Sequence, residues 1–214
     1  MRIAAIILAA GSSSRLGGEP KQLLRHNGTS LVRRMANIAL SLHVGPVVVV
    51  LGANGERVRE ELMGLPLIKP VNADWAEGLA SSLRVGLTAL ADDPIDAFLI
   101  LLTDQPYVTA DLLRQLIDKR QHTGRGIVAC RYRTGRYAGA APVEPAHLGV
   151  PALFDNRYKP AFFQFTGDVG ARKLIRQYPA DCAEVPFPLG TVDLDTPEDI
   201  ATWQLSLNRP GMEP

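Results

Sequence analysis

Short, continuous apolar runs alternate with helix-forming segments along most of this chain, and this alternation restricts its fold more than any other feature. The runs Ile3–Ala9, Val47–Leu51 and Ala97–Leu102 contain no polar side chain. Strands of this kind are buried on both faces of a parallel sheet, and parallel neighbours are joined by crossovers that usually contain a helix. We therefore predict an α/β fold, a three-layer α/β/α sandwich around a mostly parallel sheet with right-handed crossovers.

Hydrophobic periodicity and capping residues give the expected elements. The expected strands cover Ile3–Ala9, Val47–Leu51, Leu67–Val71, Ala97–Leu102, Ile127–Arg131 and Val192–Leu194. The expected helices cover Ser30–Leu42, Glu56–Met63, Gly78–Leu90, Thr109–Gln121 and Asp168–Tyr178, and a last one begins at Thr196. The Gly-, Ala- and Pro-rich stretch Tyr132–Phe154 is predicted to be loop and irregular strand. We expect one domain over residues 1–207 and a flexible tail over 208–214.

Composition narrows the class of protein. The formal net charge of +1 over 214 residues disfavours a surface that binds a polyanion, so we expect no nucleic-acid partner. Cys130 and Cys182 are far apart in the sequence and form no Cys-x-x-Cys pair, which suits a reducing cytoplasm. The apolar run at the N-terminus is too short to span a bilayer, so we expect no membrane association and a cytoplasmic protein.

A small-residue loop with two cations follows the first strand. Gly11 and the serines after it let backbone N–H groups approach an anion, while Arg15 and Lys21 supply positive charge. The spacing is neither that of a P-loop nor Gly-x-Gly-x-x-Gly, so an ordinary dinucleotide fold is disfavoured. The loop is predicted to hold phosphates; the alternative is a glycine-rich surface turn.

A free carboxylate is expected at the carboxyl end of the strand Ala97–Leu102. Thr103 and Asp104 follow this strand directly, and ligands of open α/β sheets bind at that edge. An aspartate in such a position often serves only as a turn former or a helix cap. Thr109 is better placed to cap the next helix, which leaves Asp104 available for a ligand.

These segments resemble the signatures of GT-A-like, MobA-like nucleotidyltransferases, and among them the molybdenum cofactor cytidylyltransferases. The N-terminal signature is Leu-Ala-Ala-Gly-x-Ser-x-Arg-x-Gly followed by Lys-Gln-Leu. The resemblance covers nearly the whole chain and includes four later blocks, Leu102–Pro106, Gly149–Phe154, Gly167–Arg172 and Asp193–Asp199. It implies a Rossmann-like sheet and a magnesium-dependent enzyme that transfers CMP from CTP to the terminal phosphate of a molybdopterin acceptor, releasing pyrophosphate.

The resemblance also implies roles for individual residues. It assigns catalysis to Arg15, Lys21 and Asp104, with Asp104 holding magnesium. The implied nucleotide site is Leu8, Ala9, Ala10, Gly11, Ser12, Ser13, Ser14, Arg15, Lys21, Asn72, Gly78, Ser81, Ser82, Thr103 and Asp104. The implied acceptor site is Gly167, Asp168, Gly170 and Arg172, although a tight loop before an ordinary helix would explain the same four residues.

Asp193 and Asp195 are the candidates for a second magnesium ligand. They alternate with Val192 and Leu194 at the end of the expected strand Val192–Leu194, where alternate side chains share a face. We favour Asp195 over Asp193, although Asp195 could instead help to cap the helix that begins at Thr196. Magnesium commonly takes one or two carboxylates together with phosphate oxygens and water, so one of this pair with Asp104 would suffice.

Other acceptors and roles stay open. The segment Pro142–Pro145 departs from the usual family pattern, so a sugar phosphate or an isoprenoid precursor is an alternative acceptor. A non-catalytic carrier of the cofactor is a third interpretation, and a molybdenum hydroxylase apo-enzyme is a possible recipient. The guanylyl branch carries Ala-Gly-Gly where this chain has Ala9-Ala10-Gly11, and the extra methyl group of Ala10 favours cytosine.

Overall fold

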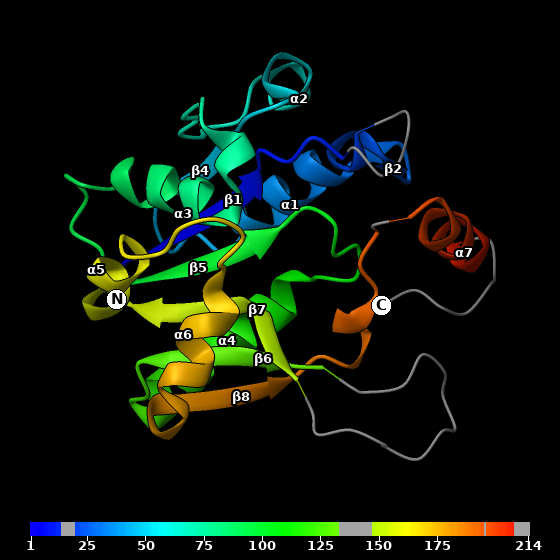
Figure 1. Ribbon diagram of the computed structural model, residues 1–214. Helices are drawn as coiled ribbons and strands as arrows, with labels where there is room; N and C mark the ends of the chain where they lie inside the picture. The colour runs from blue at the N-terminus through cyan, green and yellow to red at the C-terminus, as the bar shows by residue number, and fades with distance from the viewer. Residues whose placement is uncertain (14–19, 133–146, 195, 208–214) are drawn as a thin grey trace.

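The computed structural model describes residues 1–13, 20–132, 147–194 and 196–207. A six-stranded sheet in the order β4-β1-β5-β7-β6-β8 forms its centre (Figure 1). In that order the strands are β4 Val47–Leu51, β1 Ile3–Ala9, β5 Ala97–Leu102, β7 Leu148–Asp155, β6 Ile127–Arg131 and β8 Cys182–Pro186. β1 runs parallel to β4 and β5, and β6 runs parallel to β8. β7 is antiparallel to both of its neighbours, so the sheet is mostly parallel, as predicted.

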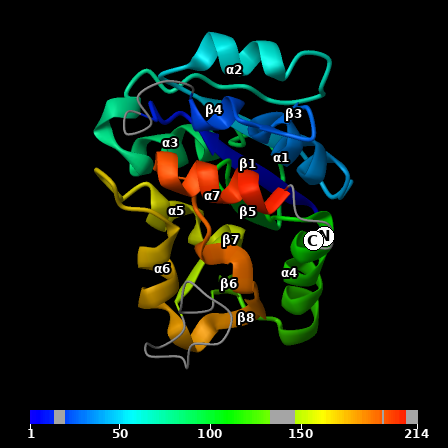
Figure 2. The same ribbon diagram turned by 90° about the vertical axis from the view of Figure 1, so that its right-hand side faces the viewer.

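Helices cover both faces of the sheet. The α-helices are α1 Leu31–Leu40, α2 Gly55–Glu61, α3 Leu79–Thr88, α4 Ala110–Thr123, α5 Lys159–Phe162, α6 Ala171–Gln177 and α7 Pro197–Leu207. Short 3₁₀ turns occur at η2 Lys21–Leu23, η3 Trp75–Glu77, η4 Asn156–Tyr158, η5 Pro179–Asp181 and η6 Pro188–Thr191, and β2 Arg25–His26 and β3 Thr29–Ser30 form a hairpin. Figure 2 shows α3, α5 and α6 on one side and α1 and α4 on the other.

The alternation of side chains along β1 explains the two cores. Ile3, Ala5 and Ile7 pack with α1 and α4, whereas Ala4 and Ile6 pack with α3 and α6 on the opposite face. Because successive strand residues point to opposite faces, a strand apolar at every position joins both cores. The predicted three-layer sandwich is therefore confirmed.

Helix starts follow the expected capping chemistry. Ser30 accepts a hydrogen bond from the N–H of Arg33, and the Thr109 hydroxyl accepts one from Leu112. At the start of α7, Thr196 and Asp199 each accept a hydrogen bond from the other's backbone N–H. This reciprocal arrangement is a capping box, which satisfies two N–H groups that the helix itself cannot bond.

Two expected strands are absent, and β7, β8 and the short strands of the β2–β3 hairpin were not among the expected strands. Most of β7 lies in the stretch Tyr132–Phe154 that was expected to be loop and irregular strand. Leu67–Val71 pairs with β4 only at the isolated bridges of Ile68 and Val71, because Pro70 has no N–H to donate to a ladder. Val192–Leu194 follows η6 as irregular backbone rather than a strand. β8 was not predicted, since this five-residue edge strand buries only Ala183 and Val185 fully.

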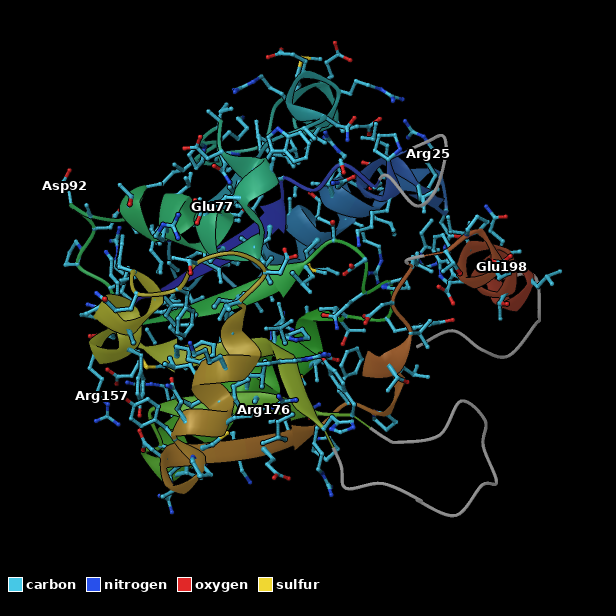
Figure 3. All side chains as sticks on the ribbon, viewed as in Figure 1. Arg25, Glu77, Asp92, Arg157, Arg176 and Glu198 are labelled. Carbon is cyan, nitrogen blue, oxygen red and sulfur yellow. The ribbon has the colours of Figure 1, made fainter. Side chains whose placement is uncertain are left out.

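Charged side chains of both signs lie around the periphery of the fold. Figure 3 labels Arg25, Glu77, Asp92, Arg157, Arg176 and Glu198 on different elements. In the part of the chain that is described, no helix is both long and apolar enough to cross a bilayer. That residues 1–207 form one domain remains a prediction, and the expected tail, 208–214, lies outside the described residues.

Candidate active site

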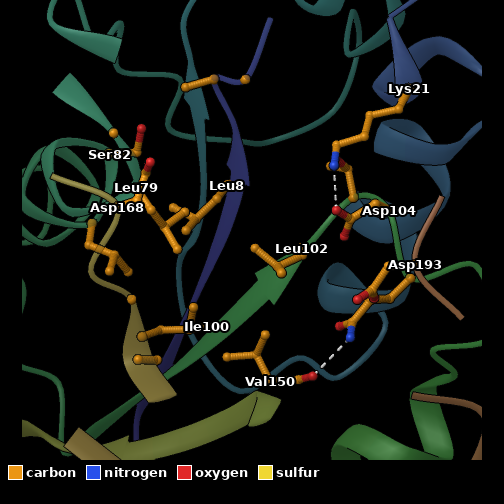
Figure 4. Close-up of a pocket in the computed structure, with 18 of the residues that line it drawn as sticks. Leu8, Lys21, Leu79, Ser82, Ile100, Leu102, Asp104, Val150, Asp168 and Asp193 are labelled. Carbon is orange, nitrogen blue, oxygen red and sulfur yellow. Dashed lines mark hydrogen bonds and ion pairs between the residues drawn. The ribbon is translucent and has the colours of Figure 1, made fainter. Parts of the chain in front are cut away.

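A cavity of about 620 Å³ opens at the carboxyl ends of β1 and β5 (Figure 4). The amino end of β7 reaches the same edge, because β7 runs antiparallel to β5. Twelve of the residues selected from the sequence line this cavity: Leu8, Ala10, Gly11, Ser12, Lys21, Gly78, Ser82, Thr103, Asp104, Asp168, Gly170 and Arg172. Asp193, the less favoured metal candidate, lines it as well. The fold thus gathers segments from both halves of the chain at one place.

A buried glutamine that was not selected from the sequence shapes the small-residue loop. The Nε2 of Gln22 donates to the carbonyl of Gly11 at 2.7 Å, and the Ser13 hydroxyl donates to its Oε1. The Ser13 hydroxyl oxygen also accepts from the backbone N–H of Lys21. Gln22 is 1% exposed, so these bonds are shielded from water. The glutamine of the Lys-Gln-Leu segment therefore fixes the loop relative to Lys21.

Lys21 and Asp104 form an ion pair inside the cavity. The Nζ of Lys21 lies 2.5 Å from Oδ2 of Asp104, and both side chains are mostly buried. The other carboxylate oxygen, Oδ1, is buried and has no hydrogen-bond donor among the described residues. A buried oxygen of this kind is costly unless a ligand or an ion satisfies it. Asp104 is thus held in place by one oxygen and retains coordinating capacity on the other.

Asp193 is brought to the same cavity by its neighbour Leu194. The N–H of Leu194 donates to the carbonyl of Asp104 at 3.2 Å. The side chain of Leu194 is fully buried against Leu31 and against Trp203 of α7. The reasoning from strand alternation was wrong, because residues 192–194 are not in a strand. The favoured candidate, Asp195, lies outside the described residues.

Replacing Leu194 with alanine is expected to lower activity more than its loss of stability explains. The change removes the apolar anchor next to Asp193 and should reduce the free energy of unfolding by about 2–5 kcal/mol. The measurement is turnover per folded molecule at a temperature where circular dichroism shows the variant to be folded. Leu205→Ala on α7, whose side chain is exposed, serves as the control. Unchanged turnover per folded molecule would show that Leu194 does not position the site.

Asn72 and Ser81 face away from the main cavity and line a smaller depression beside it. The Nδ2 of Asn72 donates to the hydroxyl oxygens of Ser81 and Ser82 at 2.8 and 3.0 Å. Its Oδ1 accepts from the N–H of Asp74. All these polar groups of Asn72 are therefore engaged within the protein. Of the three residues, only Ser82 lines the main cavity, where Asn72 orients its hydroxyl.

Glycines join the two halves of the site. Gly78 has a φ of +120°, and a Cβ there would lie 2.5 Å from the carbonyl carbon of Gly167. The carbonyl of Gly167 accepts from the N–H of Ala80 at 3.0 Å. A side chain at Gly170 would in turn meet Leu79. The expected acceptor loop thus packs on the start of α3, and its glycines have a packing role.

A polar network lies on the β6–β7 side of the cavity. The guanidinium of Arg172 stands 5.6 Å from the ring centre of Tyr132, a cation–π arrangement. The Tyr132 hydroxyl and the amide of Gln105 both bond the carbonyl of Val150. Gln105 lies inside the block that carried the resemblance but was not selected. Its burial next to Asp104 is evident only once β7 is placed beside β5.

Some residues that the sequence predicted for the site do not line the cavity, and others lie outside the described residues. Ala9 is buried in the core on the α1 side, and its carbonyl accepts from Gln22. Ser14 and Arg15 lie outside the described residues, as does the segment Pro142–Pro145. No group of three or more His, Cys, Asp or Glu side chains forms a metal-binding cluster among the residues described. Asp104 and Asp193, two of the three carboxylates that line the cavity, fit a cation that completes its shell with phosphate and water, as magnesium does.

An α/β sandwich that brings a small-residue loop, Lys21 and Asp104 together at the carboxyl ends of β1 and β5 has the arrangement of a nucleotide-handling protein. Residues 5–182 match the model of the MobA-like NTP transferase domain. The chain belongs to this family and is placed by it among the nucleotidyltransferases.

Similar proteins carry more than one named activity. The chain is 32% identical over 193 residues to nicotine blue oxidoreductase of Paenarthrobacter nicotinovorans, covering 85% of this chain and 88% of the relative. It is 27% identical over 211 residues to molybdenum cofactor guanylyltransferase of Cereibacter sphaeroides, covering 98% and 99%. The crystal structure of Rv0371c in complex with manganese, from Mycobacterium tuberculosis H37Rv, aligns with a TM-score of 0.74 and 26% identity, covering 96% and 100%.

Proposed function

We propose that this protein transfers CMP from CTP to the terminal phosphate of a molybdopterin-type acceptor and releases pyrophosphate, with Mg²⁺ as cofactor. The observation that carries the proposal is the Lys21–Asp104 pair, which lies in one cavity with Asp193 and the acceptor-side Arg172. A carrier of a finished cofactor would need no such pair of charges beside a phosphate-binding loop. The coarser assignment, a nucleotidyltransferase, rests on the family.

The reaction depends on positioning the two substrates and neutralising their negative charge more than on a general base. A phosphate monoester has a second pKa of about 6, so the attacking oxygen is already ionised at neutral pH. That oxygen would form a bond to the α-phosphorus of CTP while the bond to pyrophosphate breaks. Lys21, with Arg15, would neutralise the triphosphate, and Arg172 would hold the acceptor phosphate. These residues would bring two anions together and exclude water.

Asp104 and Asp193 are the residues that would hold the metal ion in this proposal. The unsatisfied Oδ1 of Asp104 is the observation that fits a cation there. When bound, the ion supplies positive charge to the phosphate oxygens as a Lewis acid. The manganese complex of the M. tuberculosis neighbour supports a divalent ion in this fold. Asp195 remains an alternative second ligand.

The choice of CTP rests on Ala10. Ala10 lines the cavity, and Gly52 leaves room for its methyl group, since a Cβ on Gly52 would lie 2.6 Å from that of Ala10. A site can exclude a larger base by a clash rather than by added attraction. The guanylyltransferase of C. sphaeroides shows that GTP must be tested beside CTP.

Replacing Ala10 with glycine is expected to relax the preference for cytosine without inverting it. One methyl group changes discrimination by about 1–3 kcal/mol, which corresponds to roughly 10- to 200-fold. The ratio of kcat/KM for CTP and GTP, measured by direct competition on wild type and variant, checks this expectation. Ala53→Gly, just beyond Gly52 and not part of the cavity lining, is the control. A wild-type preference for GTP would contradict the cytidylyl assignment and leave nucleotidyl transfer intact.

Pyrophosphate release tests the proposal as a whole. The four nucleoside triphosphates are each incubated with molybdopterin, a sugar phosphate or an isoprenoid phosphate, with and without Mg²⁺. We expect release with CTP and molybdopterin in the presence of the ion. Pyrophosphate release with another acceptor alone would identify that compound as the acceptor. Binding of molybdopterin without pyrophosphate release would support a non-catalytic carrier of the cofactor. Conversion of nicotine blue in parallel reactions would indicate redox activity like that named for the P. nicotinovorans relative. The proposal also includes a cytoplasmic location and a molybdenum hydroxylase apo-enzyme as recipient of the product.

A further inference from the structure

Gln105 lines the cavity and carries a buried acceptor atom that no donor of a described residue satisfies. The residue is 2% exposed and lines the cavity next to Asp104. Its Nε2 donates to the carbonyl of Val150 at 3.0 Å and to the Tyr132 hydroxyl oxygen at 3.1 Å. Its Oε1 is buried and has no hydrogen-bond donor in the described part of the chain. A buried amide oxygen without a donor is costly, so this atom points to a ligand group that donates.

The orientation of the Gln105 amide follows from the chemistry of its partners. The carbonyl of Val150 can only accept, and the Tyr132 hydroxyl donates its single hydrogen to that carbonyl. Burial raises the pKa of Tyr132 to about 12, so the hydroxyl keeps this hydrogen at neutral pH. Turning the amide over would place Oε1 against the carbonyl of Val150. The oxygen is therefore the atom left to face a ligand.

The network lies on the acceptor side of the cavity. Tyr132 follows β6, Val150 belongs to β7, and Arg172 packs on the Tyr132 ring. Arg172 is also the residue proposed to hold the acceptor phosphate, whereas Ser82 and Asp168 lie together across the cavity from Val150 in Figure 4. A group that Oε1 contacts would thus come from the acceptor and not from the base.

We infer that Gln105 Oε1 accepts a hydrogen bond from an N–H or O–H group that the acceptor carries close to its phosphate, which makes Gln105 a specificity-determining residue. This inference rests on the proposed function. An acceptor that lacks such a donor leaves the oxygen unsatisfied, and sites built around a buried polar group reject such analogues strongly. Gln105 selects among phosphorylated compounds, whereas Lys21 and Asp104 would act on phosphates of any origin.

Binding measurements on matched variants test the inference. Gln105→Met keeps the side-chain length without polar atoms, and Gln105→Glu keeps an oxygen at the Oε1 position. Tyr132→Phe removes a hydroxyl from the same network and leaves the Gln105 amide bonded to Val150. We expect Gln105→Met to weaken molybdopterin binding by about tenfold or more, as loss of a hydrogen bond to a buried group does. Gln105→Glu should not recover this affinity, because its second carboxylate oxygen would face the carbonyl of Val150 in place of the N–H donor. Tyr132→Phe should change the affinity less than Gln105→Met. CTP binding, measured by calorimetry, should be the same in all of them.

A probe without donors separates recognition from structure. Ethyl phosphate, which offers no such group to Oε1, should bind wild type and Gln105→Met equally well. Equal weakening of ethyl phosphate and molybdopterin, or weakening of CTP instead, would show that Gln105 only supports the fold or faces the nucleotide. A wild-type protein that does not bind molybdopterin would overturn the inference together with the proposed acceptor. Normal molybdopterin turnover that is insensitive to Gln105→Met would overturn the inference alone.

Discussion

Replacing Asp104 with asparagine is expected to abolish metal-dependent transfer while the protein stays folded. The amide keeps an oxygen toward Lys21 but carries no charge to offer a cation. Charge stabilisation of several kcal/mol is lost, and each 1.4 kcal/mol is about tenfold, so kcat should fall by roughly a thousandfold or more. The melting temperature should fall by only a few degrees, because about 1 kcal/mol corresponds to some 2–4 °C in a chain of this size.

The control for this variant is Asp92→Asn. Asp92 lies in the turn between α3 and β5, before the amino end of that strand and exposed at the edge of the molecule (Figure 3). Activity and melting temperature are measured on the same preparations at several Mg²⁺ concentrations. If Asp104 only shapes a turn, its replacement lowers the melting temperature and leaves activity per folded molecule intact. That outcome would remove the metal site from the account.

Replacing Lys21 with methionine is the second change with a large expected effect. The side chain keeps its apolar length but loses the charge that lies 2.5 Å from Asp104. A charge-assisted hydrogen bond contributes about 1.5–3 kcal/mol, so kcat/KM for the nucleotide should fall by roughly 10- to 150-fold for each bond lost. Turnover at subsaturating nucleotide measures this loss most sensitively.

Lys119→Met provides the matched control, since Lys119 is exposed on α4. The same change of charge and length there should leave turnover unaltered. Wild-type turnover by Lys21→Met at low nucleotide concentration would show that Lys21 does not contact the triphosphate. A lower melting temperature alone would mean that the Lys21–Asp104 pair has only a structural role.

Much of the fold could be predicted because the strands in the first half of the chain are apolar at every position. The structure reproduces the predicted bounds of three such strands, Ile3–Ala9, Val47–Leu51 and Ala97–Leu102. It also reproduces those of Ile127–Arg131, which lies in the second half and ends in the exposed Arg131. Such runs are typical of strands buried on both faces. The helix capped by Ser30 precedes the second of these strands, and the helix capped by Thr109 follows the third. In these segments the local sequence pattern and the global fold favour the same structure. Hydrophobic periodicity alone was therefore sufficient to predict the strands.

The second half was harder because its strands depend on their neighbours. β7 contains Gly149 and Pro151, which weaken any local strand signal, and it forms by pairing antiparallel to β5 and β6. The expected strand at Val192–Leu194 is instead a segment fixed by the bond between Leu194 and the Asp104 carbonyl. Tertiary contacts determine the conformation in both places, and a single sequence does not display them.

The candidate site likewise contains residues that could be predicted from the sequence and residues that could not. Motif residues such as Lys21 and Asp104 could be selected because charged side chains beside a strand end are locally conspicuous. Gln22 and Gln105 were missed, since a glutamine reads as a surface residue until its burial is known. Each glutamine bonds a backbone carbonyl outside its own element, Gln22 that of Gly11 and Gln105 that of Val150. Residues that organise a site through such contacts become visible only in three dimensions.

The fate of the α-phosphate tests the central claim most directly. The protein is incubated with Mg²⁺, molybdopterin and CTP radiolabelled at its α-phosphorus, and the products are separated. We predict that the label moves to the acceptor, that one unlabelled pyrophosphate appears for each label transferred, and that Asp104→Asn transfers none. Label that remains in CTP, or that is released as free CMP without reaching the acceptor, would contradict the assignment of cytidylyl transfer.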